Sequence, residues 1–200
     1  MEEEKIEGER FAHTLSDTLI GLATGRRILL LLGILGVYNL AVIGPAYRRI
    51  ETLSGGVGAI DFLIVYTPEK AYDMIAAYGR HGRQYYATIA LTLDTVFPLL
   101  LALVFSLVLT YVFHRAYSRE GVVQRAVLVP LAAMVSDLLE NVGIATMLLT
   151  YPQRLPAVAL LASAFSTVKW TAVLAEAILV VVGLISWAIQ KGFRGDQTSE

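Results

Sequence analysis

Four long apolar stretches, separated by polar segments, dominate the hydrophobic pattern of the 200-residue chain. Each stretch holds the roughly 20 apolar residues that an α-helix needs to cross the hydrocarbon of a bilayer. We expect spans over about 28–47, 86–113, 122–150 and 157–189. Short polar loops join the last three stretches, so these helices should pack as antiparallel neighbours. The pattern therefore predicts an all-α integral membrane protein, folded as a four-helix transmembrane bundle.

The connection between the first two spans, residues 48–85, is the longest, and we expect it to form an external helical cap. Thr67, Pro68 and Glu69 are typical of a helix start: a capping hydroxyl, a proline in the first turn, and an acid near the positive helix end. Residues 59–66 are apolar except for Asp61 and too short to span a bilayer. They are expected either to dip into the membrane interface or to pack on the bundle.

Tyrosines are frequent in this connection and at the start of the second span. A tyrosine ring suits the membrane interface, where its body lies among headgroups and its hydroxyl stays in water. On this reasoning the following residues are expected to be interface anchors: Tyr66, Tyr72, Tyr78, Tyr85 and Tyr86.

The charged ends of the chain frame a single membrane domain over 11–190. Residues 1–10 are rich in acids and poor in apolar residues, which predicts a disordered tail, and residues 191–200 form a second polar tail. With both termini cytosolic, nine basic residues lie on the cytosolic side and six on the other. Because basic residues favour the cytosolic side, we expect insertion in the plasma (inner) membrane with both termini in the cytosol.

Composition narrows the chemistry that is available. Hydrophobic residues make up 56% of the chain and charged residues 16%, below the roughly 25% charged residues of soluble domains. The net charge of −1 gives no basic surface for nucleic acid. The absence of cysteine excludes thiolate catalysis, and the three histidines, which are far apart, form no metal-spaced pair. We therefore expect no metal site and no cofactor.

Polar residues interrupt three of the four spans at similar depths. Counted inward from the external side at about 1.5 Å per residue, Asp94 lies roughly 12 Å down its span, and Glu140 and Asn141 roughly 15 Å. Lys169 lies roughly 18 Å down, and Asp137 roughly 20 Å. Ionised groups in hydrocarbon cost several kcal/mol, so they are expected to face one another inside the bundle. The depths predict one buried site shared by three helices.

This predicted site has three acids and one lysine. Carboxylates at close range in a poorly solvated site cannot all ionise, so at least one should hold a proton near neutral pH. We expect Asp137 and Glu140 to share acid/base duty with help from Asp94, and Asn141 and Lys169 to orient or polarise a ligand. A carboxylic acid beside a carboxylate serves general acid/base catalysis, and it serves a proton-coupled carrier equally well.

Two further residues of the last span belong to the same hypothesis. Trp170 is a candidate wall of the site, or a packing residue. Glu176 lies two turns beyond Lys169 and is expected either in an interior cavity or near cytosolic water.

A purely structural interpretation has equal weight at this point. Asp137, Glu140 and Lys169 can neutralise one another as an ion network that sets the helix register. Asn141 is then a helix-to-helix hydrogen-bond donor. Pro98, which has no N–H, leaves the carbonyl of Asp94 without its usual helical donor.

Three functions fit these residues. The first is a membrane enzyme or binder that takes an apolar, lipid-like small molecule and uses acid/base chemistry. The second is a small proton- or ion-linked carrier or channel, whose pathway would form more readily between the protomers of a homo-oligomer. The third is an accessory membrane subunit without chemistry of its own, held to its partners by the glycine-bearing first helix.

Overall fold

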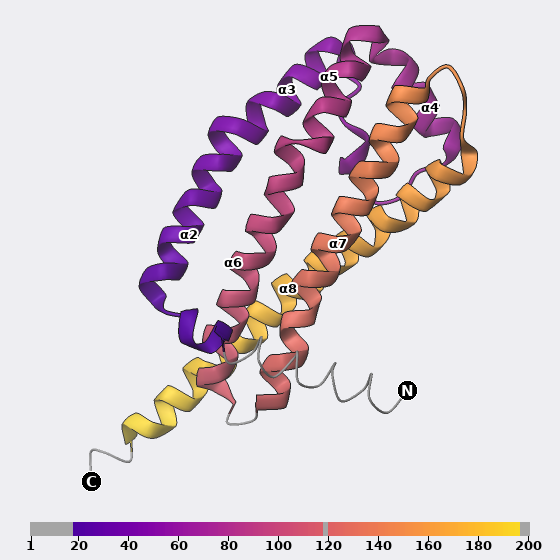
Figure 1. The fold of residues 1–200 in the computed structure, drawn as a ribbon. Helices are drawn as coiled ribbons and strands as arrows, with labels where there is room; N and C mark the ends of the chain where they lie inside the picture. The colour runs from indigo at the N-terminus through magenta and orange to yellow at the C-terminus, as the bar shows by residue number, and fades with distance from the viewer. Residues whose placement is uncertain (1–17, 118–119, 197–200) are drawn as a thin grey trace. The chain divides into compact units, whose positions relative to one another are not determined.

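The structure, a computed structural model, describes residues 18–117 and 120–196. For 120–125 and 192–196 it describes the backbone only. Within these ranges the chain is helical and contains no strand, which confirms the all-α prediction for the described part. The tail predicted over 1–10 lies outside the described residues. In chain order the elements are α2 (Gly25–Tyr38), the π-helix η1 (Asn39–Ile43), α3 (Gly44–Leu53), the 3₁₀ turn η2 (Ile60–Phe62), α4 (Pro68–Ala77), α5 (Gly79–Leu91), α6 (Leu93–Ala116), α7 (Glu120–Thr150) and α8 (Pro156–Asp196) (Figure 1).

In the described part of the chain, four helical stretches are long and apolar enough to cross a membrane, as the hydrophobic pattern predicts. They cover Gly25–Leu53, Gly79–Ala116, Ala126–Thr150 and Pro156–Lys191. The first of them continues from α2 through η1 into α3, and the second joins α5 to α6.

The chain forms two compact units. Among the described residues, the first unit comprises 18–32, 102–117, 120–131 and 173–196, and the second comprises 33–101 and 132–172. Helices α2, α6, α7 and α8 each contribute one segment to each unit.

Close helix contacts hold the second unit together. A Cβ atom placed on Gly143 of α7 would lie 2.9 Å from the Cβ of Ala162 in α8, so glycine permits this approach. A Cβ on Gly82 of α5 would lie 3.4 Å from the Cβ of Leu53 in α3. Small residues thus bring the backbones of facing helices near one another.

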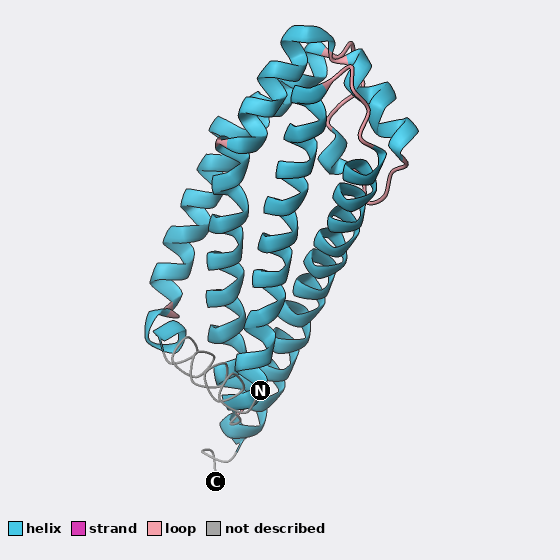
Figure 2. Ribbon diagram, turned by 45° about the vertical axis from the view of Figure 1, so that its right-hand side comes forward, coloured by secondary structure: helices cyan, strands magenta, loops and turns pink. Residues whose placement is uncertain are grey.

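The segment 59–66 packs on the helical bundle of the second unit. Of the two placements predicted for it, the membrane interface and the bundle, the bundle is the one found. The backbone N–H of Tyr66 donates to Ser163 Oγ at 2.9 Å, and Ser166 Oγ donates to the carbonyl of Leu63 at 2.5 Å. Ile60 is fully buried. Figure 2 shows this connection as pink loops interrupted by short helical pieces. Side chains of α8 therefore satisfy backbone groups that no regular element pairs.

Helix α4 begins where the sequence predicts. Thr67 is the N-cap, and its Oγ1 accepts a hydrogen bond from the N–H of Lys70 at 3.3 Å. Pro68 occupies the first helical position. Hydrogen bonds from the Glu69 backbone N–H and from the Thr67 side chain hold the pKa of the Glu69 carboxyl below its ordinary value.

The prediction of interface anchors is wrong for most of the tyrosines. Tyr72, Tyr78 and Tyr86 are each 1% exposed and Tyr66 is 5% exposed. Two of the hydroxyls and two of the rings find partners inside the protein. The Tyr72 oxygen accepts the N–H of Leu155 at 2.5 Å, the Tyr86 hydroxyl bonds Asp61, and the Tyr78 and Tyr86 rings meet edge to face at 5.4 Å. A buried tyrosine with an internal partner no longer needs interfacial water.

The first unit has its own small core, which joins residues 18–23 to the long helices. Leu19, Ala23 and Ile28 pack with Leu107 of α6 and Val127 of α7. This cluster seats the helical turn at 18–22 against α6, and it positions the pocket described below.

Candidate buried acid–lysine site

Lys169 of α8 is the centre of the polar cluster in the second unit. Its Nζ lies 2.7 Å from Glu140 Oε2 and 3.4 Å from Asp137 Oδ1, both on α7. It also donates to the backbone carbonyl of Asp61 at 3.0 Å. The contacts with Asp137 and with the Asp61 carbonyl are hydrogen bonds, and the contact with Glu140 is an ion pair. Lys169 itself is 7% exposed.

Glu140 is the most deeply buried acid of the cluster, with no exposed surface. Its Oε2 forms the ion pair with Lys169, whereas its Oε1 meets no donor among the described residues. Buried polar atoms are nearly always satisfied, so an oxygen of this kind is a candidate partner for a proton, a water or a ligand group. Trp170 Nε1 and the Tyr66 hydroxyl are buried without a hydrogen-bond partner in the same unit.

A second carboxylate, that of Asp61, is held by two tyrosines. Tyr47 donates to Asp61 Oδ2, and Tyr86 donates to Oδ1 at 2.6 Å. The Tyr86 oxygen in turn accepts the backbone N–H groups of Ile60 at 3.1 Å and of Asp61 at 3.3 Å. Asp61 is therefore linked to Lys169 by its carbonyl and to α3 and α5 by its carboxylate.

Asp61 belongs to this cluster, although the depths of the polar residues along the spans do not predict it. Its segment is not a span, so counting depth along helices assigns it no depth. The sequence feature that points to a buried role for Asp61 is that it is the one acid within the apolar run 59–66. An acid in such a run, if the run packs on the bundle, must meet a buried partner.

Asn141 contributes a hydrogen bond between helices. Its Nδ2 donates to the carbonyl of Asp94 in α6 at 3.3 Å. This is the carbonyl that lacks its usual donor, because Pro98 has no N–H. The interpretation of Asn141 as a helix-to-helix donor is thus confirmed.

The second span is interrupted at Thr92, six residues before Pro98, where the missing N–H predicts a kink. Helix α5 ends at Leu91, and Thr92 has non-helical backbone angles (φ −125°, ψ −84°) before α6 begins. Tyr38 donates to the carbonyl of Leu93 at 2.7 Å, and Thr95 Oγ1 donates to the carbonyl of Ala90 at 3.2 Å. Side chains thus satisfy carbonyls near the break, a requirement wherever irregular backbone lies within a bundle. The break places Asp94 in the first turn of α6.

The charges of the site do not balance. Asp94, 4% exposed, lies within electrostatic range of Asp61 and Asp137, so four carboxyl groups share a region with one lysine. All four ionised against one ammonium would leave three uncompensated negative charges, which a poorly solvated site does not sustain. Protons on part of the cluster would reduce this imbalance.

The structure brings together five of the seven predicted site residues. Asp137, Glu140 and Lys169 form one ion-paired group, and Asp94 and Asn141 are joined beside it. Trp170 adjoins the group, with its ring centroid 5.6 Å from Lys169 Nζ. Glu176 belongs to the first unit, where it is 2% exposed, and it takes no part in the contacts described here.

Among the described residues, no group of three His, Cys, Asp or Glu side chains is arranged to hold a metal ion. Comparisons with protein-family models, with curated proteins and with solved structures found no match. The function is therefore inferred from the site itself.

Proposed function

We propose that this chain is an integral membrane protein whose four apolar helical stretches cross a bilayer. The support is the exposure of large apolar side chains along them. In the first stretch Leu29 is 71% exposed, Val37 66% and Leu40 74%. Contiguous apolar surface of this kind is costly in water and is the expected surface toward lipid. The distribution of basic residues favours both termini on the cytosolic side of a plasma (inner) membrane.

Within that bundle, we propose a site that binds an apolar, lipid-like molecule with one polar group and acts on it by acid/base chemistry. One observation carries this proposal: Glu140 is fully buried, with one oxygen on Lys169 and the other without a donor. A carboxyl group that is anchored at one oxygen and open at the other can exchange a proton in a fixed direction.

The roles follow from the contacts. A protonated Glu140 gives its proton from Oε1 to the polar group of the substrate, and Lys169 stabilises the carboxylate that remains. Asp137, paired with the same ammonium, is the second carboxylate and accepts the proton that the substrate returns. The unpartnered Trp170 Nε1 and Tyr66 hydroxyl are the donors that orient the substrate.

Asp94 and Asn141 support this arrangement rather than touch the substrate. Asn141 is engaged with the Asp94 carbonyl, which fixes the start of α6 against α7. The Asp94 carboxyl adds negative field close to Asp137 and thereby favours retention of a proton in the cluster.

A proton-linked carrier is the second candidate, and the interruption at Thr92 favours it. Broken helices beside buried acids are a recurring arrangement at the binding sites of secondary transporters. On this alternative the same carboxyl groups bind the coupling proton, and the substrate is moved rather than changed.

The test compares the wild-type chain, Glu140→Gln and a control, Glu51→Gln, which alters an exposed acid of α3. Each protein is purified in mild detergent, its melting is recorded, and bound compounds are extracted for mass spectrometry. We expect a retained apolar compound in the wild type and the control, and its loss in Glu140→Gln with little change in melting.

Two other results would contradict the proposal of acid/base chemistry on a bound molecule. If the wild type retains no compound and Glu140→Gln melts far below it, the cluster is a structural ion network. Proton flux into vesicles that is carried by the wild type and the control but lost in Glu140→Gln, without a retained compound, assigns the site to the carrier instead.

A further inference from the structure

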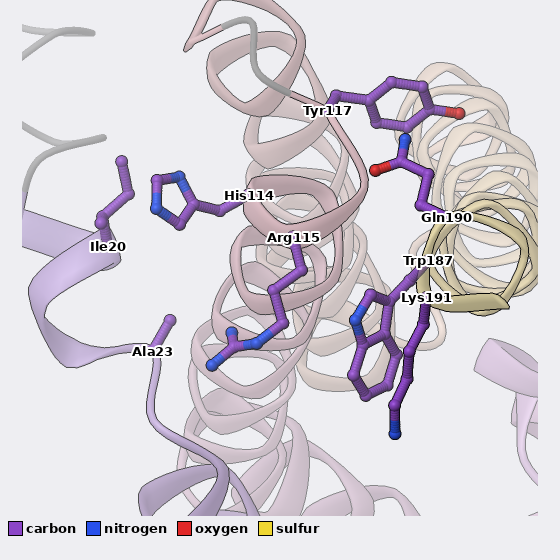
Figure 3. A pocket seen from close by; sticks show the side chains of 8 residues that line it. All are labelled: Ile20, Ala23, His114, Arg115, Tyr117, Trp187, Gln190 and Lys191. Atoms are coloured by element: carbon purple, nitrogen blue, oxygen red, sulfur yellow. The ribbon is translucent and has the colours of Figure 1, made fainter. Parts of the chain in front are cut away.

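A second candidate site lies in the first unit, in a pocket of about 620 Å³. The turn at 18–23, the end of α6 and the end of α8 form its walls, and Figure 3 shows the side chains that line it. No residue of the buried acid–lysine site takes part. A volume of this size suits a small ligand or the polar head of a larger one.

The pocket is basic. Its lining includes Arg115 and Lys191, both exposed, together with His114, and none of the described lining residues is acidic. One N–H of Arg115 donates to the carbonyl of Tyr111 at 3.2 Å, and the guanidinium lies 3.5 Å from the centroid of the Tyr111 ring. Five N–H groups make up the guanidinium fork, so this contact leaves donors for an anion.

The walls of the pocket are held in place by contacts between α6 and α8. Tyr117 and Ser186 share a hydrogen bond of 2.9 Å between their hydroxyls, and Gln190 donates to the carbonyl of Ala116. The Trp187 ring meets Tyr111 edge to face at 6.3 Å. Because these groups are fixed before any ligand arrives, little ordering cost remains for binding.

The position of the basic residues along the helices indicates which anion would be near the pocket. Arg115 is one residue before the end of the stretch Gly79–Ala116, and Lys191 ends the stretch Pro156–Lys191. If these stretches span a bilayer, which rests on the proposed function, both charges lie where lipid headgroups are. Trp187, one turn before Lys191, is the residue type that favours this depth.

We infer that this pocket binds a phosphate group through Arg115 and Lys191, and that the phosphate belongs to the headgroup of an anionic phospholipid. Arginine pairs with two phosphate oxygens at once, and lysine supplies a second charge. The aromatic ring of Trp187 lines the apolar side of the pocket, where the glycerol and the first acyl carbons would lie.

The experiment uses the full chain in non-ionic detergent and isothermal titration calorimetry. Three probes are titrated: short-chain phosphatidylglycerol, short-chain phosphatidylcholine and inorganic phosphate. The proteins are the wild type, Lys191→Gln, Arg115→Gln and a control, Arg80→Gln, which removes an exposed charge from the second unit. Lys191→Gln changes an exposed side chain, so it tests the site even if Arg115→Gln does not fold.

We expect phosphatidylglycerol to bind more tightly than phosphatidylcholine or phosphate, and its Kd to rise about tenfold in each pocket variant, as loss of one charged contact predicts. Arg80→Gln should bind as the wild type does. Glu140→Gln should also bind phosphatidylglycerol as the wild type does. A failure of the proposed acid–lysine site can therefore be distinguished from a failure of the phosphate pocket.

Two results would overturn the inference. Equal binding of phosphatidylglycerol and phosphatidylcholine, or wild-type affinity in both pocket variants, removes the phosphate site. Binding of inorganic phosphate as tight as that of phosphatidylglycerol, with the same loss in the variants, assigns the pocket to a soluble phosphate compound and removes the lipid headgroup.

Discussion

Replacing Lys169 with methionine tests how strongly the ion-paired group holds the second unit together. Methionine keeps the length and apolar stem of lysine but removes the charge that lies 2.7 Å from Glu140 and 3.4 Å from Asp137. Removing one partner of a buried pair leaves uncompensated charge and typically costs about 3–5 kcal/mol. For a chain of this size that corresponds to a melting temperature lower by about 6–20 °C.

The assay is thermal unfolding in detergent, followed by circular dichroism at neutral and at acid pH. The loss should shrink at acid pH, because a neutral carboxylic acid costs less to bury than a carboxylate. The double variant Lys169→Met with Asp137→Asn should recover part of the loss at neutral pH, since the Asp137 carboxylate left unpaired is then absent. A single variant that melts within about 1 °C of the wild type, or a double variant whose loss is the sum of the two single losses, would refute the reasoning.

Three further variants test particular contacts by thermal unfolding. Asn141→Leu removes the donor to the Asp94 carbonyl and should cost about 1–3 kcal/mol; a loss below about 0.5 kcal/mol would mean that this carbonyl needs no donor. Gly143→Ala should lower the melting temperature, because its new Cβ would lie 2.9 Å from a carbon of the facing helix, whereas Gly33→Ala, with open space around its Cβ, should raise it; the same sign for both would contradict the packing. Burial raises the pKa of the Tyr78 phenol, so the folded state favours the protonated form. That contribution is present below about pH 10 and is lost as the pH rises further, because the unfolded chain then ionises; Tyr78→Phe should show a weaker loss of stability above that pH, and an unchanged alkaline loss would argue against it.

Much of the helical framework follows from the hydrophobic pattern alone. Runs of apolar residues identify the four long stretches, and Thr67 with Pro68 predicts the start of α4. Pro98 also points to an unpaired carbonyl at Asp94, which Asn141 satisfies. These features are predictable because they depend on local composition or on a missing N–H, and both are visible in the sequence.

The rest depends on contacts between distant parts of the chain. Asp61 joins the site because side chains of α8 hold its segment, and no periodic signal places an irregular segment. Tyr86 resembles an interface residue until its hydroxyl is seen to bond Asp61. The break at Thr92 has no glycine or proline to mark it, so it follows from tertiary packing rather than from propensity.

The most direct test of the account asks whether the buried cluster holds a proton at neutral pH. Infrared difference spectroscopy of the protein in lipid vesicles, recorded through a pH titration, reports protonated carboxyl groups by their carbonyl stretch. The account predicts a protonated-carboxyl signal at neutral pH that titrates reversibly, is lost or reduced in Glu140→Gln and is retained in the exposed control Glu51→Gln. A wild type without such a signal at neutral pH, or a signal identical in Glu140→Gln, would contradict it.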